Sequence, residues 1–206
     1  MDKKAMYRLS YGLFVLTSPD PVNGRLNGCI NNTAIQVASD PNQIGICINK
    51  ANYTHDLVMA AGKFNISCIS TEADFELFKR FGFQSGRDVD KFAGFADFKL
   101  SGNELPYITK GTNAFFSVWV DKVLDLGSHT FFAGPVTDME VLSEAASCTY
   151  EYYQSNIKPK PEAKKEEGKK IWRCKVCGYE FEGEELPADF ICPVCKHPAD
   201  DFEKNF

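Results

Sequence analysis

Two pairs of cysteines near the C-terminal end of the chain have the spacing of a metal site. Cys174 and Cys177 form one Cys-x-x-Cys pair, Cys192 and Cys195 form another, and 14 residues separate the pairs. A tight turn can present both sulfurs of such a pair, so two pairs can place four thiolates at the corners of a tetrahedron around zinc or iron. Segments below about 40 residues rarely fold without a metal, disulfides or a partner. We therefore expect a small four-cysteine metal domain here.

The rest of the composition predicts a cytoplasmic protein. Of the 206 residues 44% are hydrophobic and 25% are charged, as in soluble globular proteins. The start MDKKAMYRLS lacks a signal-peptide core, and no apolar run reaches the roughly 18 residues that span a membrane. The remaining cysteines are scattered singly and are expected to be small buried side chains in a reducing compartment. They are Cys29, Cys47, Cys68 and Cys148.

Charge and composition divide the chain into three parts. Residues 1–157 carry 13 Lys and Arg against 17 Asp and Glu, and residues 171–206 carry 4 against 8. Between them KPKPEAKKEEGKK, residues 158–170, has no large apolar side chain and is predicted to be a flexible linker. No concentrated basic face exists for a phosphate backbone, so we expect no nucleic-acid partner.

The N-terminal part is predicted to be mainly β. Its Val-, Ile-, Phe- and Thr-rich segments are bounded by Gly, Pro, Asn or Asp, and they are residues 11–18, 33–39, 43–50, 64–70, 113–126 and 129–142. Two short helices are predicted, one from the cap Thr54 to Gly62 and one from Thr71 to Gly82, with Asp74 at capping-box spacing. Without regular βαβ alternation or a Gly-x-Gly-x-x-Gly motif, an antiparallel barrel is favoured over a Rossmann sheet.

The C-terminal part resembles rubredoxin, a one-iron electron carrier. The resemblance rests on IWRCKVCGYEF, DFICPVC and ADDFE, with Phe190 where rubredoxins commonly have Trp. It implies an Fe³⁺/Fe²⁺ centre under an aromatic core of Trp172, Tyr179, Phe181, Phe190 and Phe202. The insert between the cysteine pairs is shorter than in free-standing rubredoxins. A zinc ribbon that recruits a partner is the alternative, although the net charge of −4 opposes nucleic-acid binding.

The N-terminal part resembles the flavin reductase-like family of FMN-binding split barrels. YGLFVLTS, the run from Gly28 to Val58, FNISCIS and GSHTFFAGPV follow that family's order across nearly the whole segment. The resemblance implies a homodimer with FMN near the subunit interface and NAD(P)H as substrate.

Three groups of residues are candidates for holding FMN. The resemblance places the ring beside residues 31–33, with residues 47–50 following on the next strand, and a helix N-terminus with polar donors suits the phosphate. The loop at residues 80–92 resembles the family's flavin-side loop. The candidates are Asn27, Asn31, Asn32, Thr33, Cys47, Ile48, Asn49, Lys50, Asn52, Thr54, Phe83 and Arg87, with Lys50, Asn52 and Thr54 assigned to the phosphate. The alternatives are plain turn and cap residues, and a surface loop packed by Phe83 and Phe92.

His129 is the candidate catalytic residue. Relatives commonly read Gly-Asp-His at this point, whereas this chain reads Gly-Ser-His with Ser128. A carboxylate that could orient the imidazole is therefore missing.

Together the two parts resemble the high-molecular-weight rubredoxins of anaerobic bacteria. That resemblance implies an electron-transfer oxidoreductase that carries electrons from NAD(P)H through FMN to iron. A flavodiiron protein reducing oxygen or nitric oxide is the implied acceptor. The alternatives are a flavin reductase that releases reduced flavin, and a non-enzymatic flavin-binding or redox-sensing protein with a zinc ribbon.

Overall fold

The structure, a computed structural model of the chain, describes residues 1–159 and 171–205. The chain divides into two compact units, Met1–Lys158 and Pro159–Phe206. The predicted linker, residues 158–170, lies almost wholly outside the described residues, as does Phe206.

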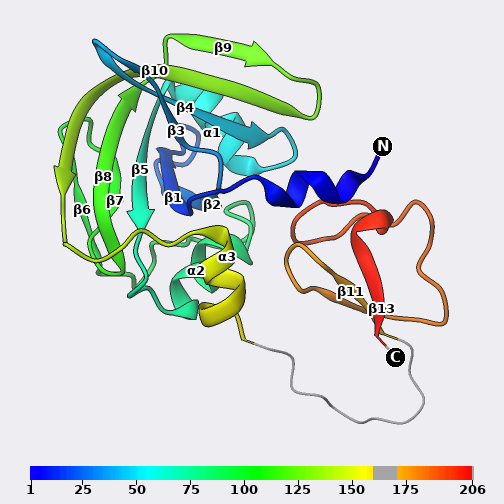
Figure 1. Cartoon of the computed structure of the whole chain (residues 1–206). Helices are drawn as coiled ribbons and strands as arrows, with labels where there is room; N and C mark the ends of the chain where they lie inside the picture. The colour runs from blue at the N-terminus through cyan, green and yellow to red at the C-terminus, as the bar shows by residue number, and fades with distance from the viewer. Residues whose placement is uncertain (160–170, 206) are drawn as a thin grey trace. The chain divides into compact units, whose positions relative to one another are not determined.

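One antiparallel sheet of eight strands forms the wall of the N-terminal unit. Its order is β2–β1–β5–β8–β10–β4–β3, with β9 paired to β10. Figure 1 shows these strands curving around a common interior. Strands β2 and β3 are the two ends of this order, which confirms the predicted split antiparallel barrel. The bounds are β1 Phe14–Pro19, β2 Leu26–Asn31, β3 Ile35–Ser39, β4 Asn42–Asn49, β5 Lys63–Ile69, β8 Thr112–Trp119, β9 Lys122–Asp125 and β10 His129–Val141.

The long strand β10 bends the sheet into this shape. Its first half pairs with β4 and its second half with β8, and the register with β8 shifts between Val136 and Asp138. Such a bulge kinks a strand and raises its local twist. Nearby, Gly134 lies so close to Trp119 that an added Cβ would be 1.7 Å from the Trp119 carbonyl oxygen. Only glycine fits this crossing of β8 and β10.

Helix α1, Tyr53–Ala61, and helix α2, Phe75–Gly82, lie where helices were predicted, but other residues cap them. The Asn52 side chain accepts the Thr54 N–H, and Asp74 accepts the Leu77 N–H. The predicted caps Thr54 and Thr71 are therefore wrong, because each lies beside a stronger Asn or Asp cap. Gly62 ends α1 with φ 62°, as predicted. The remaining helices described in the N-terminal unit are η1 Lys3–Arg8, α3 Tyr150–Tyr152 and η2 Tyr153–Ile157.

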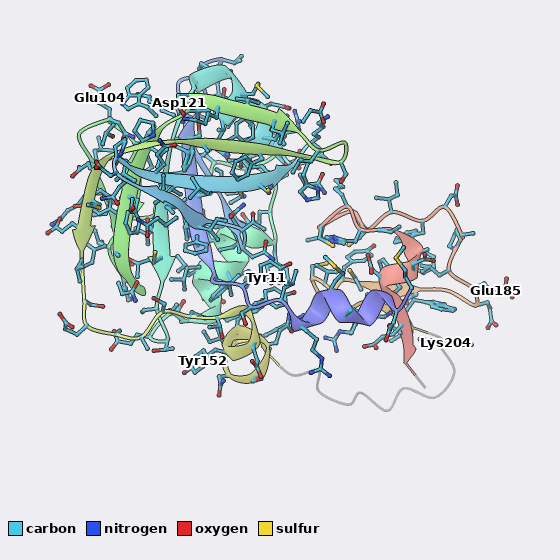
Figure 2. All side chains as sticks on the ribbon, turned by 45° about the horizontal axis from the view of Figure 1, so that its top comes forward. Tyr11, Glu104, Asp121, Tyr152, Glu185 and Lys204 are labelled. Atoms are coloured by element: carbon cyan, nitrogen blue, oxygen red, sulfur yellow. The ribbon has the colours of Figure 1, made fainter. Side chains whose placement is uncertain are left out.

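Two apolar clusters stabilise the N-terminal unit. One lies inside the barrel and includes the fully buried Phe64 and Phe132. The other packs α2 onto the sheet, where the Phe78 ring meets Tyr153 of η2 at 4.3 Å between centroids. Figure 2 shows side chains filling the space that the strands enclose.

Several strands differ from the prediction. The predicted strand at residues 113–126 is interrupted after Trp119, so that it forms β8 and β9. Strand β2 and the hairpin of β6, Phe98–Leu100, and β7, Pro106–Ile108, were not predicted. The β2 sequence LNGCIN has Gly and Asn, which are rare in strands. The hairpin strands are three residues long and depend on side-chain bonds, such as Asn65 Nδ2 to the Leu105 carbonyl at 3.0 Å.

The C-terminal unit is a three-stranded sheet around a small aromatic cluster. Its order is β12–β11–β13, with β11 Ile171–Cys174, β12 Glu180–Glu182 and β13 Phe202–Asn205, and η3 spans Ala199–Asp201. The Phe190 ring lies 4.8 Å from Phe181 and 5.3 Å from Phe202. The Trp172 indole donates to the Gly183 carbonyl at 3.2 Å. The predicted aromatics thus pack together beside the cysteines.

Candidate metal centre and flavin site

The four cysteines of the C-terminal unit converge on one point. Their sulfur atoms all lie within 4.8 Å of one another, with Cys174 to Cys195 at 3.5 Å and Cys177 to Cys192 at 3.4 Å. Sulfurs around a tetrahedral ion with metal–sulfur bonds near 2.3 Å lie about 3.8 Å apart. A disulfide would need about 2.05 Å. The donor set therefore fits a tetrahedral metal ion and not a pair of disulfides.

Two similar turns present these sulfurs. Gly178 donates its N–H to the Cys174 carbonyl at 2.8 Å, and Lys196 donates its N–H to the Cys192 carbonyl at 2.9 Å. Both residues have positive φ, 79° for Gly178 and 61° for Lys196. The glycine of the first turn was expected for this reason, whereas the second turn holds a lysine in the same left-handed region.

The surroundings of Cys174 favour its thiolate. The pKa of Cys174 is lowered by hydrogen bonds from the thiols of Cys177 and Cys195 and by the backbone N–H groups of Val176 and Cys177, which outweigh its burial. Cys174 and Cys192 are buried, and Cys177 and Cys195 are partly buried. The same contacts with Cys174 raise the pKa of Cys177 and of Cys195. Since a thiolate is the form that binds metal, metal binding to the site releases protons from these thiols.

In the N-terminal unit, one group of predicted flavin residues joins β2 to β4. Asn31 Nδ2 donates to the Cys47 carbonyl at 2.8 Å, and the Thr33 hydroxyl donates to the same carbonyl at 2.9 Å. The Asn31 Oδ1 accepts the Thr33 N–H at 2.9 Å. These bonds hold the turn after β2 against the middle of β4, and they place amide and hydroxyl groups together at that point.

A second group surrounds the start of α1. The Asn27 amide donates to the Thr54 hydroxyl at 2.9 Å, while Asn52 caps the helix. Asn27 and Thr54 are buried, at 4% and 1% exposed. Their side chains therefore connect β2 to the N-terminus of α1, which is the kind of place where anions bind.

The predicted phosphate ligand Lys50 already has an anionic partner. Its ammonium lies 2.7 Å from both carboxylate oxygens of Asp125 in β9. This bond and the Gly127 N–H lower the pKa of Asp125. The Lys50 side chain is 39% exposed, and an ammonium has three donors, so further contacts remain open to it.

His129 lies beside this pair at the start of β10. It is the ladder partner of Asn49 in β4, and its Nδ1 is 2.9 Å from the Ser128 hydroxyl. The Ser128 hydroxyl is thus bonded to the ring in this chain. A hydroxyl can orient the ring but does not stabilise its charge as a carboxylate does.

Arg87 of the loop after α2 lies against α1. Its guanidinium is 2.9 Å from Asp56 Oδ2 and stacks over the Tyr53 ring at 4.4 Å from the centroid. Asp56 also bonds His55, whose other ring nitrogen reaches the Thr130 hydroxyl at 2.9 Å. The prediction included Arg87 but missed Tyr53 and Asp56, because a contact across 31 residues leaves no local signal in the sequence.

The other predicted flavin residues lie in different surroundings. Ile48 is 2% exposed and packs in the barrel core, so only its backbone can face a ligand. The Phe83 ring packs against Phe75 at 5.6 Å between centroids. Asn49 accepts the Ala51 N–H, and Asn32 is partly buried in the turn after β2. Two cavities, of about 430 Å³ beside α2 and about 240 Å³ between β3, β4 and β8, are lined by none of the predicted flavin residues.

The donor types at α1, β2 and β4 nevertheless fit a flavin that carries a phosphate. Amide, hydroxyl and backbone groups suit the edge of the ring, and a helix N-terminus with Lys50 suits a phosphate.

Comparison with known proteins assigns both units. The flavin reductase like domain matches residues 6–160, and the rubrerythrin, rubredoxin-like domain matches residues 172–203. The chain belongs to the flavin reductase-like family. The rubredoxin-like domain follows its flavin reductase-like domain.

Two relatives match this chain, one over nearly its whole length and one over about three quarters of it. A high molecular weight rubredoxin of Moorella thermoacetica is 35% identical, over 99% of this chain and 100% of that protein. A ferric-chelate reductase (NAD(P)H) of Archaeoglobus fulgidus is 40% identical over 153 residues, 74% of this chain and 89% of that protein. The chain is thus an electron-transfer oxidoreductase with a flavin-binding fold and a rubredoxin-like four-cysteine site.

Solved structures agree on the fold of the flavin reductase-like domain. The flavin reductase PheA2 has a TM-score of 0.60 at 25% identity, over 72% of this chain and 93% of that one. An FMN-binding protein from Thermus thermophilus has a TM-score of 0.58 at 25% identity, over 66% and 72%. Among the described residues no helix combines the length and apolar character needed to cross a membrane.

Proposed function

We propose that this chain takes electrons from NAD(P)H with FMN in its N-terminal unit and delivers them through one iron ion in its C-terminal unit. A separate protein then accepts them. The observation that carries the proposal is the presence of a flavin reductase-like domain and a rubredoxin-like four-cysteine site in one chain, matched over their whole length by the Moorella relative.

In this proposal each unit holds one redox group. Asn31, Thr33 and the backbone of Cys47 hold the ring, and Lys50 with the α1 N-terminus holds the phosphate. The cysteines Cys174, Cys177, Cys192 and Cys195 hold the iron. When bound, a flavin takes two electrons from a hydride and gives them up singly, and an iron ion accepts one at a time.

His129 and Arg87 have supporting roles in the same proposal. Arg87 is the exposed cation on the flavin-side loop, where it can line the pocket of the bound FMN. His129, bonded to Ser128, lies at the start of β10 beside Lys50. Its role in this proposal is to orient the bound groups and not to transfer protons, because electron transfer requires little acid–base chemistry.

Iron is favoured over zinc because the cysteine site lies among aromatic rings. Trp172, Tyr179 and Phe190 are packed against the buried cysteines. Such a shell limits water and sets the potential of an iron centre. Zinc has no redox chemistry, so a zinc site would leave electron transfer to the flavin alone.

The proposed acceptor is a flavodiiron protein or a similar redox protein with a basic surface. The C-terminal unit exposes acidic side chains, among them Glu184, Glu185 and Asp189, and Figure 2 shows Glu185 pointing outward. Complementary charge speeds the encounter of two electron-transfer partners. We propose further that the chain is cytoplasmic and forms a homodimer. Exposed apolar side chains such as Ile35 of β3 and Leu124 of β9 support the dimer.

A second candidate function is reduction by the flavin reductase-like domain alone. The Archaeoglobus relative aligns with 74% of this chain. In this alternative the chain reduces an iron chelate or releases reduced flavin, and the cysteine site is a structural or docking zinc site.

An anaerobic titration of the purified full chain with NADH separates the two functions. The proposal expects overlapping flavin and ferric–thiolate absorption bands, both of which bleach. The Cys177→Ser variant should keep the flavin band and its response to NADH but lose the ferric band. A wild-type flavin spectrum without iron bands would support the second function instead.

A further inference from the structure

A buried lysine lies in the loop that follows α2. Lys91 is 4% exposed, although the residues before it, Arg87 to Asp90, are exposed. Lysine is almost never buried to this extent without a partner. Within residues 1–159 and 171–205 no carboxylate pairs with its ammonium, so the reason for its burial lies in its hydrogen bonds.

Both bonds of the Lys91 ammonium go to backbone carbonyls. Nζ donates to the Gly28 carbonyl of β2 at 2.8 Å and to the Phe81 carbonyl of α2 at 3.1 Å. Strand β2 is an edge of the sheet, and Phe81 lies in the last turn of α2, where carbonyls lack helical partners. One side chain thus ties the loop to both elements. Burial lowers the pKa of Lys91, with the nearby Cys29 thiol acting in the opposite direction.

The neighbours of Lys91 fix the same end of the loop. Arg80 Nη1 donates to the Lys91 carbonyl at 3.0 Å. The Phe92 ring, 8% exposed, packs edge-on against Phe81 at 5.4 Å between centroids. Lys91 and Phe92 therefore form the deep anchor of the segment.

From this anchor the loop reaches the predicted flavin site. Gly86 passes so close to Asn27 that an added Cβ would lie 2.0 Å from its Oδ1. Asn27 in turn bonds Thr54 at the start of α1. One residue later Arg87 meets Asp56 and Tyr53. The five-residue segment from Arg87 to Lys91 joins this contact to the deep anchor.

We propose that Lys91 is a positioning residue of the flavin site, whose buried ammonium ties the loop to β2 and α2 and so holds Gly86 and Arg87 against Asn27 and α1. This inference rests on the proposed flavin function. Lys91 acts through the loop and touches neither flavin nor NAD(P)H.

The test compares Lys91→Met in the full chain with the control Lys79→Met. Lys79 is an exposed lysine of α2 that pairs with Glu76. FMN affinity is measured by titration of flavin-free protein, and the loop is probed by trypsin cleavage after Arg87. Losing two hydrogen bonds from a charged donor should raise the FMN dissociation constant about tenfold in Lys91→Met. Cleavage after Arg87 should be several times faster, with neither change in Lys79→Met.

A double-mutant cycle separates positioning from plain destabilisation. If Lys91 acts by placing Arg87, then Lys91→Met and Arg87→Met together should raise the FMN dissociation constant no more than the larger single effect. Additive effects, or a lower melting temperature with unchanged FMN affinity and cleavage, would overturn the inference. If Lys91→Met does not fold, Lys91→Gln replaces it in the test. This variant keeps a hydrogen-bond donor, so it should raise the FMN dissociation constant by a smaller factor. Wild-type protein that binds no FMN would instead overturn the proposed function, while the cleavage result still tests the loop.

Discussion

The two units of the chain are held together in different ways. The N-terminal unit encloses two clusters of fully buried side chains, including Phe64, Phe78 and Phe132. In the C-terminal unit the buried part of the core is two cysteines and Phe202, with the other aromatics only partly buried. One unit is stabilised by apolar burial, while the other depends on its metal ligands.

The same contrast applies to their binding sites. All four metal ligands lie within 22 residues of sequence and come from two similar turns. The candidate flavin residues come from β2, β4, α1 and a loop, and most of them already bond one another. A metal site whose ligands lie close together in the sequence leaves a local sequence signature. A flavin site whose residues come from separate strands, a helix and a loop does not.

The largest effect is expected from removing one metal ligand. Cys177→Ser should abolish tight metal binding and unfold the C-terminal unit, because binding of a structural metal supplies on the order of 10 kcal/mol to such a domain. Metal analysis and amide NMR would measure this, and the barrel signals should persist. The partly buried Cys68, changed to Ala, is the control and should retain the metal. Barrel signals lost together with the metal would contradict the independence of the two units.

Truncating a core side chain of the barrel should destabilise the N-terminal unit and leave the C-terminal unit intact. Phe64 is fully buried inside the barrel, so Phe64→Ala should lower the free energy of unfolding of the N-terminal unit by about 3–5 kcal/mol. Chemical denaturation followed by flavin release would report the loss. The ferric absorption bands should survive to the wild-type denaturant concentration. An equal shift of both transitions would show that the units unfold as one.

The smallest effect is expected from the ion pair between Arg87 of the flavin-side loop and Asp56 of α1. Hydrogen bonds from His55, and then from Arg87, lower the pKa of Asp56 below its usual value, outweighing partial burial. Its contribution is therefore fully present above the unfolded pKa near 4 and is lost as pH falls through the lower folded value. This loss of unfolding free energy at low pH is the acid limb of the stability curve. Asp56→Asn should make the acid limb smaller by less than about 1 kcal/mol, since the pair is half exposed.

Urea unfolding of the N-terminal unit between pH 5 and pH 2 would measure the difference between Asp56→Asn and wild type. Asp121→Asn, which removes an exposed carboxylate paired with Lys122, is the matched control. An identical acid limb in Asp56→Asn and wild type would show that the pair does not contribute to stability.

The sequence predicted the parts of the fold that depend on local pattern. The cysteine turns, Gly178, the end of α1 at Gly62 and most strands of the barrel follow from spacing and alternation. The misses have physical causes. Strand β2 carries Gly28 because an added Cβ would lie 3.1 Å from the Phe81 ring, and it carries Asn27 because that side chain bonds Thr54. Asn52 caps α1 in place of Thr54 because it lies two residues earlier and its amide oxygen accepts the Thr54 N–H. The partners Asp125 for Lys50 and Asp56 for Arg87 depend on tertiary contacts, which no local pattern records.

The measurement that tests the central claim most directly is anaerobic rapid mixing of the full chain with excess NADH. Flavin and iron reduction would be followed at separate wavelengths over a range of protein concentrations. The account predicts that the flavin band bleaches first and the ferric band follows at a rate independent of protein concentration. A ferric band that stays oxidised while the flavin is reduced, or that bleaches only in proportion to protein concentration, would contradict electron transfer between the two units.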